Sequence, residues 1–452
     1  MVYLLSVKVV PKMIKTIFLF FVLFIFFGCS DSDTPLKIEP KIDFIKTYGG
    51  LKNDSAQSVI STNDGGYIVA GFTQSNSMDI TNKTNDSFDF WLLKFDALDN
   101  LLWSKTFGGS NDDLSYDIIQ TNDNGFAVVG KSNSNDGDIS SNEGSNDIWI
   151  LKLDSEGTIT WEKSFGFSGN DQGFSILQTS DNGFFISGVL DVSASNGNGN
   201  DKFSKRHAGG DYWGLRLDVN GDKLWRNYFG GSFTDSSYDA AQTSDNGFLL
   251  IGSSDSNDVD IKNNKGTYDF WLVKISSTGT LEWEKSLGGS EIDEAHAITK
   301  TSDGNFIVVG DSRSSDKDIS NPKGAADIWV VKISPLGKII WEKSFGGSNF
   351  DASRTVFKTL DGGFLITGST RSQDGNFNTN YGQNDLYVLK ITHSGNFEWQ
   401  KTIGGNNIDV GYGITELNNG NIIVVGESSS SDGNVIENKG FSDVLIAKII
   451  LE

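Results

Sequence analysis

The residues best suited to bind a ligand recur at one position of the chain but change in type. Three residues after an aspartate that returns every 58 to 64 residues stand four aromatic residues, a glutamine, a histidine and an arginine: Gln57, Tyr116, Phe174, Tyr238, His296, Arg354 and Tyr412. Aromatic rings beside one arginine and one histidine are typical of a pocket that takes a sugar or a peptide. The alternative is that these rings pack between repeated units.

A second candidate is a basic segment in an otherwise acidic chain. The stretch 190–210 is six residues longer than its counterparts and carries Lys202, Lys205, Arg206 and His207. Such a segment is expected to contact an anionic glycan or an acidic partner. The alternative is a tolerated surface insertion, because long loops cost little stability.

Motifs of known catalytic chemistry are absent from the sequence. It contains no G-x-S-x-G, no H-E-x-x-H and no phosphate-binding glycine loop, and its three histidines fall in three different repeats. We therefore expect no enzyme and no cofactor. A carboxylate pair for glycoside hydrolysis stays open, because acids are plentiful and their distances are unknown at this stage.

One loop resembles a calcium-binding loop, with oxygen side chains at alternate positions and a glycine at the turn: Ser132, Ser134, Asp136, Gly137, Asp138 and later Glu143. Serine stands where calcium loops use carboxylates, and most of the other repeats lack this glycine. A hydrogen-bonded turn is the favoured interpretation, with calcium as the alternative.

The elements that must position these residues form a repeat of about 58 residues. Six tryptophans are spaced 58, 64, 58, 58 and 58 residues apart, and Phe44 takes the corresponding place before the first: Trp103, Trp161, Trp225, Trp283, Trp341 and Trp399. A second set has the same period: Asp89, Asp147, Asp211, Asp269, Asp327, Asp385 and Asp443. Each unit contains four strand-like runs with Asp-Gly or Asn-Gly turns, which predicts an all-β, seven-bladed β-propeller with four antiparallel strands per blade.

The two ends of the repeat array indicate how the ring closes. The array begins with a lone fourth strand, Phe44 to Tyr48, and ends with a third strand, Asp443 to Ile450. We predict that these two strands pair, so that the N-terminal strand completes the C-terminal blade. No atypical capping repeat is present, as an open array would require.

Other recurring residues are expected to be structural. The aspartate four residues after each paired-glycine position is predicted to accept hydrogen bonds from turn amides, and the tryptophans are predicted to pack within and between blades. The loops between the second and third strands are long and polar, and they lie on the same face as the connections between blades. That elaborated face is where binding is expected.

The N-terminus is predicted to be an export signal. Residues 17–27 form an apolar run after Lys12 and Lys15, too short to span a bilayer and typical of a secretory signal. The single cysteine, Cys29, follows directly and resembles the lipidated cysteine of a bacterial lipobox. We therefore expect a signal peptide over 1–28, lipidated Cys29 with a flexible tether over 29–42, and the propeller over 43–452.

The acidic run Ser30-Asp31-Ser32-Asp33 and the repeat pattern resemble surface lipoproteins of Bacteroidetes-type bacteria. This resemblance covers 43–452 and implies the propeller fold, but little about a ligand. The net charge is −22, and −25 without the three lysines of the first 29 residues, which disfavours nucleic acid as a partner.

The resulting hypothesis is an outer-membrane lipoprotein, on the cell surface rather than the periplasmic side, held by its lipid alone. It would bind or scaffold an envelope protein or a glycan, as a monomer or within a hetero-complex. The alternatives are a carbohydrate-active hydrolase or lyase, and a purely structural envelope component.

Overall fold

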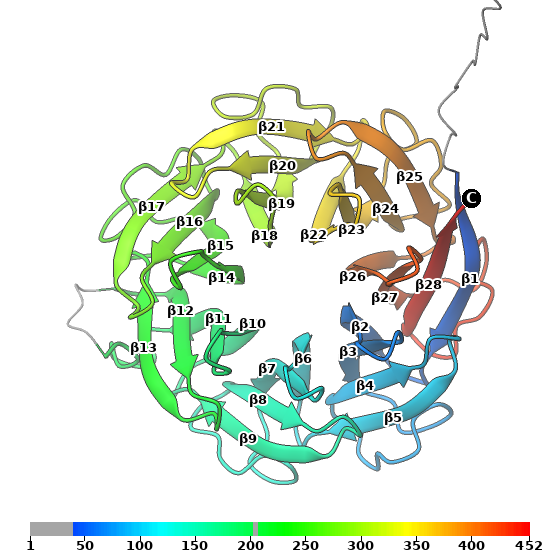
Figure 1. Ribbon diagram of the computed structural model, residues 1–452, viewed down its shortest axis with the longest axis horizontal. Coiled ribbons are helices and arrows are strands. Elements are labelled where there is room, and N and C mark those ends of the chain that lie inside the picture. The colour runs from blue at the N-terminus through cyan, green and yellow to red at the C-terminus, as the bar shows by residue number, and fades with distance from the viewer. Residues whose placement is uncertain (1–38, 202–206) are drawn as a thin grey trace, which may run out of the picture. The chain divides into compact units, whose positions relative to one another are not determined.

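Residues 39–201 and 207–452 are described by the computed structural model, and residues 1–38 and 202–206 are not. The described chain forms seven four-stranded antiparallel sheets, the blades, arranged in a closed ring around an axis (Figure 1). All named elements in this part of the chain are strands. The predicted seven-bladed β-propeller is confirmed. Over these residues, no helix is long and apolar enough to cross a membrane.

The strands of each blade follow one another from the axis outward. The first three blades consist of β2 (Asp54–Ser61), β3 (Tyr67–Thr73), β4 (Asp89–Phe95) and β5 (Leu101–Phe107); β6 (Asp113–Gln120), β7 (Phe126–Ser132), β8 (Asp147–Leu153) and β9 (Ile159–Phe165); β10 (Gln172–Gln178), β11 (Phe184–Asp191), β12 (Gly210–Leu217) and β13 (Lys223–Phe229). The next three consist of β14 (Asp235–Gln242), β15 (Phe248–Ser254), β16 (Asp269–Ile275) and β17 (Leu281–Leu287); β18 (Asp293–Lys300), β19 (Phe306–Ser312), β20 (Asp327–Ile333) and β21 (Ile339–Phe345); β22 (Asp351–Lys358), β23 (Phe364–Thr370), β24 (Asp385–Ile391) and β25 (Phe397–Ile403). The seventh blade contains β26 (Asp409–Glu416), β27 (Ile422–Ser428), β28 (Asp443–Leu451) and β1 (Pro40–Tyr48).

The seventh blade closes the ring with both ends of the described chain, as predicted. β1 lies antiparallel to β28, with Tyr48 opposite Val444 and Pro40 opposite Leu451. β1 begins ahead of the predicted start at residue 43, because Pro40, Lys41 and Ile42 pair with the last residues of β28. The closing strand is therefore nine residues long, and its start lies on the edge of the ring that carries the short turns.

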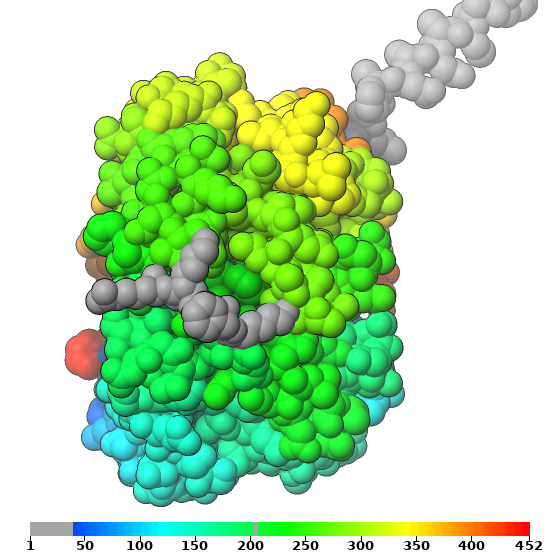
Figure 2. All heavy atoms as spheres, turned by 90° about the vertical axis from the view of Figure 1, so that its left-hand side faces the viewer, coloured from blue at the N-terminus to red at the C-terminus, as the bar shows by residue number. Residues whose placement is uncertain are grey.

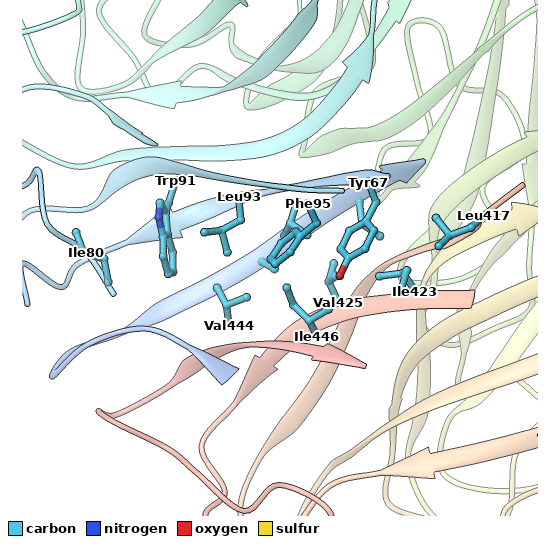
Figure 3. Packing of buried hydrophobic residues seen from close by; sticks show 13 residues of the cluster. Tyr67, Ile80, Trp91, Leu93, Phe95, Leu417, Ile423, Val425, Val444 and Ile446 are labelled. Carbon is cyan, nitrogen blue, oxygen red and sulfur yellow. The ribbon is translucent and has the colours of Figure 1, made fainter. Parts of the chain in front are cut away.

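The hydrophobic core lies between the blades. All seven residues of a third strand such as β8 are buried, because apolar neighbours cover both faces of the sheet. Figure 3 shows the junction of the seventh and first blades, where Trp91 and Phe95 on one side pack with Val425 and Ile446 on the other. Seen from the side, consecutive blades form one continuous outer wall (Figure 2). The tryptophans of the third strands pack between blades. The ring centroid of Trp149, for example, lies 4.6 Å from that of Phe90 in the preceding blade.

The repeated aspartates of the first strands are structural, as predicted. Asp293 of β18 is buried and accepts hydrogen bonds from the Gly289 amide at 2.7 Å and from Ser314 Oγ at 2.9 Å. It also accepts one from Ser312 Oγ. The carboxylate thus ties the connection between two blades to the end of β19. The same network recurs around the ring, for example at Asp409.

The two faces of the ring differ, as the loop lengths predict. On one face the turns between first and second strands are tight, with Gly65 at φ 85° or, in the next blade, Asn124 at φ 64° in the left-handed conformation. On the elaborated face the connections between blades bond to the long loops. The Gly49 amide, for instance, donates to Asp79 at 2.9 Å.

Candidate functional site at the axial cavity

Each first strand carries a β-bulge, and the bulged residue is the variable position singled out by the sequence. In the first blade the pairing of β2 with β3 passes from Ala56 to Ser58 and skips Gln57. The same irregularity skips the corresponding residue of the other six blades: Tyr116, Phe174, Tyr238, His296, Arg354 and Tyr412. A bulge removes one residue from the ladder and re-aims its side chain.

All seven bulged residues line one cavity on the axis of the ring, of about 150 Å³. Because the bulges lie early in the innermost strands, the cavity belongs to the side of the elaborated face. The structure therefore brings the whole predicted set together, and each member is half-buried. A cavity of about this size holds a single six-membered ring rather than a drug-sized molecule.

One side of the cavity is an aromatic arc, formed by Tyr116, Phe174 and Tyr238. The ring centroids of Tyr116 and Phe174 lie 4.9 Å apart, and those of Phe174 and Tyr238 lie 5.4 Å apart. Burial raises the pKa of Tyr238, and the nearby charge of Glu294 adds to this, so its hydroxyl stays protonated at neutral pH. The arc offers a continuous apolar wall with two hydroxyl groups.

The other side is a polar arc, formed by His296, Arg354, Tyr412 and Gln57. His296 continues the aromatic series, 5.4 Å from Tyr238, and its Nε2 lies 2.7 Å from Nη1 of Arg354. The Tyr412 hydroxyl donates to Glu427 at 3.3 Å. Packing between blades alone does not explain this arc, because it places a guanidinium, an imidazole and an amide beside the aromatic rings.

Two aspartates stand at the same level of the axis as the bulged residues. Asp117 accepts hydrogen bonds from Ser58 Oγ of the preceding blade and from the Ile176 amide of the following blade, both at 3.0 Å. Its own strand supplies a third, from the Ile118 amide at 2.8 Å. Asp239 makes the equivalent contacts two blades further round, with Ser175 Oγ, the Ile298 amide and the Ala240 amide.

These two carboxylates are unusual in charge as well as in position. Burial raises the pKa of Asp117 to about 7, against the three hydrogen bonds that lower it, and the charge of Asp239 adds to the rise. Burial likewise raises the pKa of Asp239 to about 6. Because each aspartate links three consecutive blades by hydrogen bonds, we interpret both primarily as structural residues that hold the blades together.

Sequence reasoning missed four acids of this region. Asp117 and Asp239 follow a bulged tyrosine where the other blades have Ser, Ala, Thr or Gly. Asp311 lies 3.1 Å from His296 Nε2, and burial raises the pKa of Glu427 beside Tyr412. The signal was available: six of the seven second strands repeat a Gly-x-Ser/Thr pattern in which the middle residue varies between blades, and Asp311 and Glu427 occupy that middle position.

The predicted basic contact segment is corrected at His207. Its side chain is 2% exposed, because it packs against Asp211 with Nδ1 and Oδ2 2.5 Å apart and reaches towards Asp260. The His207 side chain therefore contacts acids of the third and fourth blades and is not an exposed contact surface. Lys202, Lys205 and Arg206 lie outside the described residues.

The residues of the suspected calcium loop are engaged with the protein itself. Ser132 Oγ and Ser134 Oγ both donate to Asp113, and Asp136 accepts from the Ser110 amide at 2.7 Å. Asp138 accepts from the Gly108 amide at 3.1 Å. Within residues 39–201 and 207–452, no group of three or more His, Cys, Asp or Glu side chains is arranged to hold a metal ion.

Comparison with known proteins supports the fold and leaves the function open. No family model matches the chain, and no curated protein matches it. Solved structures do: the WD40 β-propeller domain of Doa1 is 11% identical, with a TM-score of 0.52 over 91% of this chain and 97% of that one. The Neurospora crassa Pan2 WD40 domain is 10% identical, with a TM-score of 0.49 over 91% of this chain and 95% of that one. At such identities the likeness is one of β-propeller fold alone.

Proposed function

We propose that this chain is a binding module that takes one ring-shaped unit of a glycan in its axial cavity. The observation that carries the proposal is the bulge series. Seven equivalent positions are re-aimed at one cavity, yet they carry different side chains with an aromatic arc facing a polar arc. Aromatic faces bury the apolar C–H faces of a sugar, while Arg, His, Gln and Tyr supply hydrogen bonds to its hydroxyl groups.

The proposal predicts a large loss of binding when the aromatic arc is cut. Tyr238→Ala removes the ring and hydroxyl at the end of the arc that adjoins His296, so we expect binding to weaken by about tenfold or more, as for loss of a buried aromatic anchor. The measurement is a glycan-array screen of the purified protein, followed by titration of the strongest hit.

The matched control is Phe233→Ala, which removes an aromatic ring that is 60% exposed in the connection just before β14. It should leave binding within about twofold, as substitutions outside the contact usually do. Equal losses in both variants, or no glycan binding by the wild type, would overturn the proposal and favour a protein-scaffold role.

A hydrolase is the second candidate, because Asp117 and Asp239 stand beside the cavity with raised pKa values. Glycosidases use such a pair, one carboxyl protonated and one ionised. In this structure every contact of the two aspartates serves the ring, which favours binding. New reducing ends appearing from a bound glycan, and lost in Asp239→Asn, would favour hydrolysis instead.

We further propose that the ring is displayed at the cell envelope by a lipid on Cys29. The lipobox-like sequence supports this, because the single cysteine, Cys29, directly follows the apolar run 17–27 and Gly28.

The anchor predicts a simple change in fractionation. Cys29→Ser removes the acceptor of the lipid, so the protein should move from the membrane fraction to the soluble one and lose incorporation of a labelled fatty acid. Ser30→Ala is the matched control, and it should change neither the membrane fractionation nor the incorporation of the fatty acid. Retention of the label in Cys29→Ser would contradict lipidation at this residue.

A further inference from the structure

Arg354 differs from the buried cations of the third strands. The third strands each carry a buried lysine or arginine, and all of them are paired with an aspartate, as Arg216 is with Asp181 at 2.6 Å and Lys332 with Asp303 at 2.7 Å. Across residues 39–201 and 207–452, no carboxylate lies within salt-bridge distance of the Arg354 guanidinium, although it is half-buried in a strongly acidic protein. Burying a charge without a counter-charge is costly.

The partner that Arg354 does have is a weak one. A guanidinium only donates hydrogen bonds, so His296 Nε2, 2.7 Å from Nη1, must be the acceptor and the imidazole must be neutral. The same Nε2 lies 3.1 Å from Asp311 Oδ1, which calls for a proton on that nitrogen. One nitrogen cannot serve both neighbours. An arriving acceptor for Arg354 would free His296 to donate to Asp311.

We infer that Arg354, with His296 beside it, is a carboxylate subsite of the axial cavity, and that the sugar unit bound there is acidic, such as a uronic acid. This inference rests on the proposed glycan-binding function and narrows it. The guanidinium fork matches a carboxylate in two parallel hydrogen bonds. The sugar ring then lies across the cavity against Tyr238, which adjoins His296.

The acids near the cavity do not oppose an anion there as strongly as their number suggests. Asp117 and Asp239 accept three hydrogen bonds each from the blades. Glu427 accepts from the Tyr412 hydroxyl. Asp311 faces His296, which becomes its donor once Arg354 turns to the ligand. Among the cavity-lining residues that the structure describes, Arg354 is the one with a permanent positive charge.

The test compares three probes of one shape on the purified full-length protein: trigalacturonic acid, its methyl ester and the neutral galactose trimer. For the wild type we expect the acid to bind about 10- to 100-fold more tightly than the ester, the range for a hydrogen-bonded charge pair. Added salt should weaken binding of the acid alone.

Variants of Arg354 then test whether this residue causes the preference for the acid over its methyl ester. Arg354→Gln should bring the acid down to the affinity of the ester, and Arg354→Lys should retain part of the preference, because it keeps the charge and loses the fork. Arg371→Gln, which removes an exposed arginine from the long loop of the same blade, is the control and should keep the full preference.

The outcomes separate the inference from the function beneath it. Equal binding of all three probes by the wild type overturns the carboxylate subsite and leaves glycan binding intact. Binding of none of them, with binding of other glycans absent too, overturns both. Preference for a peptide with a free C-terminal carboxylate over the acidic trimer would also overturn the inference, in favour of a peptide site. Because the probe comparison uses the wild type, it stays decisive even if Arg354→Gln fails to fold.

Discussion

Replacing Asp293 with alanine is expected to lower the free energy of unfolding by about 3 to 5 kcal/mol. The buried carboxylate accepts from the Gly289 amide and from the hydroxyls of Ser312 and Ser314. Alanine leaves these donors buried without an acceptor and opens a space at the joint of two blades. Each orphaned donor costs about 1 to 3 kcal/mol, and the costs are not fully additive.

Thermal unfolding followed by calorimetry or circular dichroism measures this effect. For a ring of about 400 residues, 1 kcal/mol corresponds to about 1 °C in Tm, so a fall of about 3 to 5 °C is expected. Glu291→Ala is the matched control, two residues away with an exposed side chain, and should change Tm by less than about 0.5 °C. A fall no larger than that of the control would refute the structural role of this aspartate series.

The architecture was predictable because its signals repeat. A tryptophan and an aspartate recur with one period, and the two unmatched strands at the ends of the array complete each other's blade. The closing pair β1 and β28 confirms that interpretation. Only the exact start of β1 was missed, because Pro40 to Ile42 show no strand pattern of their own and gain their structure from pairing with β28.

The candidate site was predictable in membership but not in geometry. The seven variable residues were identified by comparing repeats, yet nothing local signals that they are bulged, since a bulge depends on how β2 and β3 align across the ladder. The axial acids were missed for a related reason. The role of Asp117 depends on hydrogen bonds from Ser58 and Ile176, each almost 60 residues away along the chain.

His207 shows how charge alone misleads. In the sequence it ends a basic run, which indicates an exposed contact. In the structure it turns inward to Asp211 and Asp260, because the third-strand aspartates sit beside other acids and need a counter-charge. Where the loop supplies no such cation, the buried aspartate resists ionisation, and the stability of the ring then depends on pH.

The stability of the ring is expected to fall as the pH rises from about 4 to 8. The aspartates that begin the third strands have one buried oxygen, Oδ1, without a hydrogen-bond partner among the described residues. Burial raises their pKa, to about 7 at Asp385 and about 6 at Asp443, for instance. The unfolded chain ionises these acids from about pH 4, whereas the folded ring resists ionisation, so the penalty starts there and is complete above the folded pKa.

A second series of acids sets the lower limit of this range. A hydrogen bond from Thr243, together with the Gly247 amide and Lys274, lowers the pKa of Asp245 to about 2 against the effect of burial. Such a carboxylate contributes stability above the unfolded pKa of about 4 and loses it as the pH falls through its own pKa. Maximum stability is therefore expected near pH 4 to 5, with a lower Tm at pH 8.

Asp385→Asn tests this origin at a single junction. The Tyr381 amide donates to Oδ2, a bond that an asparagine carbonyl can keep, while Oδ1 crowds Gly404 next to the carboxylate of Asp409. An amide placed there cannot ionise, so it removes the repulsion between Asp385 and Asp409. We expect the variant to be more stable than the wild type by about 2 kcal/mol at pH 8 and by about 0.5 kcal/mol or less at pH 4.5.

The matched change is Glu291→Gln, which removes one negative charge from an exposed site and should stabilise the ring by no more than about 0.5 kcal/mol at pH 8 and by less at pH 4.5, near the isoelectric point. If Asp385→Asn behaves like it, the pH dependence arises from the net charge of −22 rather than from the junctions. If Asp385→Asn gains stability only at high pH, each blade junction carries a proton at acidic pH. The ring would then be most stable when these buried acids are neutral.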